Sequence, residues 1–91
     1  LILNLSSMGE DEILNDFRER ATTVCHSCGT CRMGPGIQSA VVNFDLQVFG
    51  IEGFRVVDAS IFPNITSANT TALTIMVAHE AALRILNSLE A

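Results

Sequence analysis

The chain has 91 residues, of which 48% are hydrophobic and 16% are charged, with a formal net charge of -5 at pH 7. This length allows one small domain at most, and the composition excludes an intrinsically disordered chain. The acidic balance and the absence of a Lys/Arg cluster argue against nucleic acid as a partner, because that affinity rests on cationic side chains. No apolar run approaches the roughly 20 residues that a membrane span requires, so we expect none.

A short helix is predicted near the start of the chain, at about residues 11–21. Acidic residues stand where it would begin, and Arg18 and Arg20 stand near its end, where cations suit the helix dipole. Ahead of it, residues 1–5 alternate apolar side chains with Asn4, which is typical of a strand. Because this strand starts abruptly at Leu1, we expect the chain to be a segment of a longer protein.

A loop and several short strands are predicted in the middle of the chain. Residues 22–36 predict a loop, because Gly and Pro interrupt them and no regular periodicity persists. Extended pieces are expected at residues 41–44 and 47–49, and residues 54–58 predict a buried strand that ends at an acidic residue. The polar residues that could carry chemistry concentrate in the loop.

A long helix is predicted to follow these strands. Asn69 or Thr70 occupies the N-cap position, and apolar residues continue at helical spacing to about Leu89. The fold class is therefore α+β, or part of an α/β protein, with a short N-terminal helix, a few strands and a long C-terminal helix. The strand that ends at Asp58 and the start of the long helix could present a carboxylate and unsatisfied N–H groups to one ligand.

Three segments carry a resemblance to a known family. They are residues 26–34 (HSCGTCRMG), 54–63 (FRVVDASIFP) and 67–72 (SANTTA). Each is similar to a block of the glucose-methanol-choline (GMC) oxidoreductases, and the three blocks occur in the same order as in that family. The resemblance covers roughly residues 10–88. Three blocks in the right order are far more specific than a lone motif. It implies that residues 1–91 are the C-terminal domain segment of a two-domain, FAD-dependent enzyme.

The resemblance implies oxidation of an alcohol CH–OH group to a carbonyl, with hydride transfer to FAD. His26 would be the catalytic base, because imidazole is the side chain suited to proton transfer near neutral pH. Asn69 would be the second catalytic residue and would hold the substrate oxygen. An amide cannot take up a proton, so the base role would rest on His26 alone.

The same resemblance implies contacts to FAD. Asp58 and Ala59 match a contact with the flavin ribityl chain and pyrophosphate. Asn69 and the backbone N–H groups of Thr70 and Thr71, at the helix start, are also expected to contact the cofactor, and the two N–H groups match a site that stabilises negative charge on the reduced flavin. The family's Gly-x-Gly-x-x-Gly fingerprint is missing here, so the expected partner is the N-terminal FAD-binding portion of the same enzyme.

Two residues depart from the family's pattern beside the expected base. Ser27 stands where the family has Pro, and Cys28 stands where it has an apolar residue. These departures bear on how the His26 side chain is oriented, and not on its assignment as the catalytic base. The motifs leave open the alcohol, the electron acceptor, the compartment, and whether the enzyme is an oxidase, a dehydrogenase or a lyase.

A different interpretation rests on Cys25, Cys28 and Cys31. The last two have Cys-x-x-Cys spacing, and together with Cys25 and His26 they supply soft ligands for zinc. A small metal-binding or dithiol redox module is therefore an alternative, although ligands so close in sequence strain a tetrahedral site, and we expect no metal. An inactive fragment is a third alternative. His79 belongs to no motif and is expected on a helix surface.

Overall fold

The structure is a computed structural model that describes residues 5–90, except for the side chain of Leu5. The strand predicted at residues 1–5 lies outside these residues apart from the backbone of Leu5. A short 3-10 helix, η1 (Leu5–Ser7), precedes helix α1 (Glu10–Arg20), and a second 3-10 helix, η2 (Ala59–Ile61), precedes helix α2 (Thr70–Glu90). Both predicted α-helices are confirmed, to within one or two residues at their ends.

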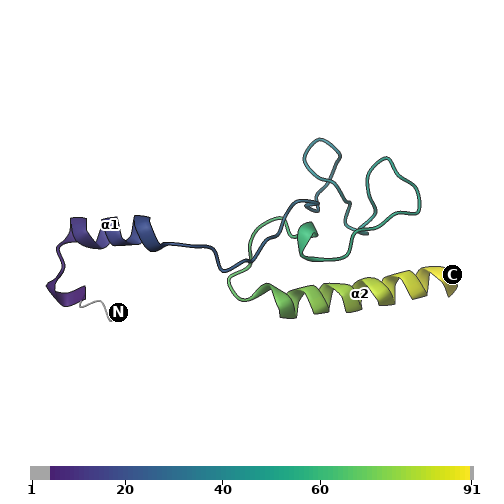
Figure 1. Cartoon of the computed structure of the whole chain (residues 1–91). Coiled ribbons are helices and arrows are strands. Elements are labelled where there is room, and N and C mark those ends of the chain that lie inside the picture. Colours follow the sequence, from purple (N-terminus) through teal and green to yellow (C-terminus); the bar gives the residue numbers. More distant parts are fainter. Residues whose placement is uncertain (1–4, 91) are drawn as a thin grey trace.

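Helix α1 is held together by local interactions. Glu12 accepts a hydrogen bond from the backbone N–H of Gly9, at 2.9 Å, which satisfies one donor at the helix start. Asp16 pairs with Arg20 one turn later, at 2.6 Å. Acidic residues occupy the first turn and basic residues the last, as the helix dipole favours. Figure 1 shows α1 at one end of the molecule, joined to the rest by an extended segment.

Helix α2 packs along the looped part of the chain. Ala81, on one face, is 3% exposed, and the half-buried Leu73 and Val77 lie on the same face. This face contacts η2 and the segments around it. Other large apolar side chains of α2 remain exposed, namely Ile75, Met76, Leu83, Leu86 and Leu89.

The predicted strands at residues 41–44, 47–49 and 54–58 are not confirmed. Within residues 5–90 the backbone forms only isolated bridges, of Met33 with Val42, Val42 with Val48 and Gln47 with Arg55. A ladder cannot extend from these bridges because turns interrupt the backbone on either side. Leu46 adopts a left-handed φ of 63°, and glycines at φ 79° and 71° follow in the next turn. The architecture is thus two helices joined by looped, bridged segments rather than α+β with strands.

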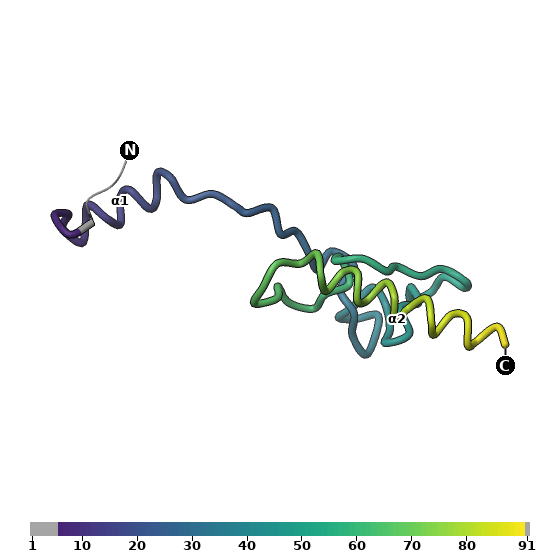
Figure 2. The backbone as a smooth tube through the Cα atoms, turned by 90° about the horizontal axis from the view of Figure 1, so that it is seen from below, coloured from purple at the N-terminus to yellow at the C-terminus, as the bar shows by residue number. Residues whose placement is uncertain are grey.

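A small core lies where the loops meet α2. Its buried side chains are Val42, Leu46, Ile61, Phe62 and Ala81. The radius of gyration is 19.8 Å, against about 12 Å expected for a compact chain of this length. Figure 2 shows the reason, since α1 and the segment after it extend away from the loops and α2. Packing is therefore confined to one part of the molecule, and that part carries the predicted site residues.

Candidate functional site

Two of the recognised segments are joined by backbone hydrogen bonds. The N–H of Gly29 donates to Ala59 O at 3.3 Å, that of Cys31 to Ser60 O at 2.9 Å, and that of Met33 to Ile61 O at 2.8 Å. The N–H groups of every second residue in the loop after His26 thus donate to the carbonyls of three consecutive residues of η2. This pairing places the loop that follows His26 directly beside Asp58.

The pairing depends on a glycine. Gly29 has φ 83°, in the left-handed region, and a Cβ built on it would lie 3.2 Å from the backbone oxygen of Phe62. Any other residue would be strained by its backbone conformation and crowded by a backbone atom that cannot move aside easily. Gly29 therefore lets the loop approach η2 closely.

The structure brings His26 and Asn69 into contact. Nε2 of His26 lies 3.2 Å from Nδ2 of Asn69, although the two residues are 43 positions apart in the sequence. Asn69 precedes α2, and its Oδ1 accepts a hydrogen bond from the N–H of Thr71 at 2.9 Å, as an N-cap does. His26 is half-buried, whereas Asn69 is exposed. The predicted catalytic residues therefore form a pair held at the start of a helix.

The backbone just before His26 has an unusual conformation. Cys25 adopts a φ of 61°, which costs a non-glycine residue roughly 1–2 kcal/mol. Its N–H donates to the hydroxyl of Thr23 at 3.0 Å, and this bond helps to hold the turn. The turn redirects the chain immediately before the imidazole. Ser27, which replaces the family's Pro, therefore follows a turn that is already fixed by other residues.

Asp58 is kept ionised by its own loop. Its Oδ1 accepts hydrogen bonds from both the hydroxyl and the backbone N–H of Ser60, and these bonds lower the pKa of the Asp58 carboxyl below its ordinary value of 3.8. Both bonds go to Oδ1, so Oδ2 remains to accept a donor from a ligand. Ser60 was not among the predicted site residues. The signal was present, because an Asp side chain in a turn often accepts a hydrogen bond from the backbone two residues further on, as in an Asx turn.

A hollow of about 370 Å³ adjoins the paired segments. It is lined by Ser27, Cys28, Thr30, Asp58, Ala59, Ser60 and Thr74. The hollow is therefore lined by two of the residues predicted to contact FAD, Asp58 and Ala59, and by the residue next to His26. The predicted catalytic and cofactor-binding residues are thereby brought to one region, at the start of α2 and beside η2.

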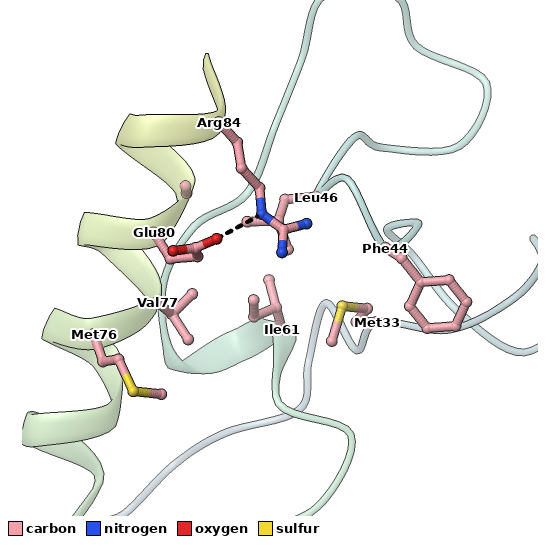
Figure 3. Close-up of a pocket in the computed structure, with 9 residues that line it drawn as sticks. Met33, Phe44, Leu46, Ile61, Met76, Val77, Glu80 and Arg84 are labelled. Carbon is pink, nitrogen blue, oxygen red and sulfur yellow. Dashed lines mark hydrogen bonds and ion pairs between the residues drawn. The ribbon is translucent and has the colours of Figure 1, made fainter. Parts of the chain in front are cut away.

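A second hollow is an apolar groove whose lining does not include His26 or Asn69. It has a volume of about 460 Å³ and lies between α2 and the loops; it is lined by Met33, Phe44, Leu46, Ile61, Met76, Val77, Glu80, Ala81 and Arg84. Figure 3 shows the side chains of Met33, Val77 and Ile61 around this space, with Glu80 paired to Arg84 at 3.1 Å. We place the candidate site at the His26–Asn69 pair because the charged side chains that line the groove, Glu80 and Arg84, are already paired with each other.

The cysteines are not paired with each other. Cys25 is exposed, Cys28 and Cys31 are half-buried, and all three are free thiols. Among residues 5–90 no group of His, Cys, Asp and Glu is arranged to hold a metal ion. His79 lies exposed on α2. Within residues 5–90, neither α1 nor α2 has both the length and the apolar composition needed to cross a bilayer.

Comparison with known proteins gives one family. Residues 4–78 match the family model described as GMC oxidoreductase. An alcohol dehydrogenase (acceptor) of Pseudomonas putida is 53% identical over 73 residues, which are 80% of this chain and 13% of that protein. Oxygen-dependent choline dehydrogenases of Proteus mirabilis and Brucella ovis are 51% and 46% identical, over 82% and 85% of this chain. The chain spans only 13–14% of the length of these relatives.

Proposed function

The chain belongs to the GMC oxidoreductase family, and from this premise we propose that it forms the C-terminal catalytic part of an enzyme that oxidises a CH–OH group to a carbonyl. The observation that supports this most strongly is the contact between His26 and Asn69, which unites two of the matched segments across 43 positions. The similarity to alcohol and choline dehydrogenases supports an alcohol as the substrate class.

His26 is the base of the proposed reaction. Conversion of CH–OH to C=O removes one proton from oxygen and one hydride from carbon. The imidazole takes the hydroxyl proton, and Asn69, whose Nδ2 lies 3.2 Å from Nε2, donates a hydrogen bond to the same oxygen. Because an amide has no basic nitrogen, Asn69 orients the oxygen and stabilises its developing charge but does not take up the proton.

FAD is the proposed cofactor, and when bound it would supply the acceptor for the hydride. The ionised Asp58 suits the ribityl hydroxyls, which are donors, better than the pyrophosphate, which is an anion like itself. Ala59 lines the same hollow. At the start of α2 the N–H of Thr71 already donates to Asn69, so Thr70 and the helix dipole carry most of the proposed stabilisation of the reduced flavin.

The remaining part of the FAD site is proposed to lie in another portion of the same protein. The hollow of about 370 Å³ beside Asp58 holds only part of such a large cofactor. The chain lacks a Gly-x-Gly-x-x-Gly fingerprint, which cradles the pyrophosphate at a helix N-terminus. We therefore assign residues 1–91 to the C-terminal domain segment, with the N-terminal FAD-binding portion as its partner.

A chimera tests this function. The matching 73 residues of the Pseudomonas putida alcohol dehydrogenase would be replaced by those of this chain, with the rest of that protein unchanged. We expect the purified chimera to retain a flavin spectrum and an alcohol to bleach it under anaerobic conditions. A folded chimera that retains flavin but shows no bleaching with any primary alcohol or choline would contradict the proposal.

A further inference from the structure

We propose that Asn69, held by the start of α2, sets the tautomer of His26, so that Nδ1 carries the proton and Nε2 keeps its lone pair. This makes Asn69 a positioning residue for the base as well as a contact for the substrate. The catalytic meaning of the inference rests on the proposed function, whereas the tautomer itself follows from two hydrogen bonds of the folded chain.

The first step fixes the orientation of the Asn69 amide. The backbone N–H of Thr71 can only donate, so the Asn69 atom that lies 2.9 Å from it must be the acceptor, Oδ1. Thr71 is the second residue of α2, where an N-cap side chain accepts. A flip of the amide would point two N–H groups at this donor and lose the cap. The other end of the amide, Nδ2, is therefore a donor with a fixed direction.

The second step fixes the imidazole. Nδ2 of Asn69 lies 3.2 Å from Nε2 of His26, and a donor at this distance needs an acceptor. A neutral imidazole has one N–H and one lone pair, so an accepting Nε2 leaves the proton on Nδ1. The opposite tautomer would place two donors face to face and lose this hydrogen bond. The start of α2 therefore determines the tautomer of the His26 imidazole through the side chain of Asn69.

The third step is the consequence for the proposed reaction. An alcohol hydroxyl that replaces the hydrogen bond between Nδ2 and Nε2 donates to the lone pair on Nε2 and accepts from the N–H on Nδ2. As the O–H bond breaks, the proton forms the Nε2–H bond, the ring becomes a cation with protons on both nitrogens, and the Nδ2 donor faces the oxygen. No exchange of tautomers has to precede the transfer, so the base is ready before the substrate arrives.

Nitrogen NMR of the 91-residue chain tests the tautomer directly. The chain has only two histidines, so labelling with 15N-histidine gives two imidazole patterns, and His79→Gln assigns them. At about pH 8.5, where imidazole is neutral, we expect a pyridine-type shift at Nε2 of His26 and a pyrrole-type shift at Nδ1. His79, exposed on α2, should show the averaged pattern of a free ring.

Two substitutions show whether Asn69 is the cause. Asn69→Asp keeps a good N-cap but presents an acceptor to the ring, so the proton of His26 should move to Nε2. Asn69→Ala removes the contact, and the tautomer ratio should change by roughly fivefold or more, as one hydrogen bond allows. Helix content from circular dichroism verifies that α2 is intact in both variants.

Two results would overturn the inference. One is a protonated Nε2 on His26 in the native chain, and the other is an unchanged tautomer in Asn69→Asp with α2 intact. The chimera tests the proposed function independently of the tautomer. A chimera that binds flavin without oxidising alcohols would reject that function while the NMR result stands, and an active chimera with Nε2 protonated would reject the tautomer inference alone.

Discussion

Helix α1 and the start of α2 show how differently two parts of one chain are stabilised. Helix α1 has no buried residue, and Phe17 in its apolar stripe is 67% exposed. Its order comes from Glu12, Asp16 and Arg20, all within the helix. The start of α2, in contrast, is also in contact with a residue far away in sequence, because Asn69 lies 3.2 Å from His26. Local rules therefore build a helix at both places, but only long-range contacts build the candidate site.

The largest effect is expected from His26→Ala in the chimera. Removal of a general base typically lowers turnover by about 10²–10⁴-fold, so alcohol-dependent bleaching of the flavin should slow by that factor. His79→Ala is the matched control, because His79 lies exposed on α2 outside the site, and should leave the rate unchanged. If His26→Ala and His79→Ala slowed the bleaching equally, the assignment of His26 to the active site would be wrong.

The contrast between the two regions also predicts their stabilities. Ile61 is 2% exposed in the small core, so Ile61→Ala should lower the free energy of unfolding by about 2–5 kcal/mol, or abolish a cooperative transition. Phe17→Ala, on α1, should change it by less than about 0.5 kcal/mol. Urea unfolding followed by circular dichroism measures both. A large effect of Phe17→Ala would show that α1 packs against something.

A smaller effect is expected where the two recognised segments meet. Gly29→Ala places a Cβ at φ 83° and 3.2 Å from a backbone oxygen, and should cost roughly 1–2 kcal/mol of folding free energy. Gly36→Ala is the control, since a Cβ there meets nothing within 4 Å and its φ is ordinary. If both variants unfold at the same urea concentration, the close approach of the loop to η2 is not needed.

The smallest effect concerns Asp58 and pH. Because hydrogen bonds from Ser60 lower the pKa of Asp58 in the folded chain, they stabilise it above the ordinary value of 3.8, and this stabilisation is lost as pH falls through the folded value. Ser60→Ala should therefore be slightly less stable than the native chain at pH 7, by an amount that shrinks on acidification. Urea midpoints along a pH series measure the difference, and a gap that widens toward low pH would contradict this account.

Much of the helical structure could be predicted from the sequence, because its causes are local. The charges at the ends of α1 and the N-cap before α2 are signals within a few residues of the structure they specify. The strands at residues 41–44, 47–49 and 54–58 could not be predicted in the same way. Apolar, extended segments form a ladder only with a partner at matching register, and here turns leave them only isolated bridges.

The candidate site was found through family motifs rather than periodicity. Nothing local to His26 indicates that it contacts Asn69, since the contact depends on how η2 and the core place both segments. Thr74, which completes the hollow beside Asp58, lies outside the three matched segments, and its place in the site follows only from the packing. The roles of His26, Asn69, Asp58, Ala59, Thr70 and Thr71 stay predictions until they are measured.

A double-mutant cycle in the chimera tests most directly whether His26 and Asn69 act as one unit. The values of kcat/KM for His26→Ala, Asn69→Ala and the double variant would be compared with the unsubstituted chimera. If both side chains act on the same substrate oxygen, the double variant should be little slower than His26→Ala alone, because groups that act together are strongly non-additive. Losses that multiply in full would mean that the two residues act independently, and would contradict the account.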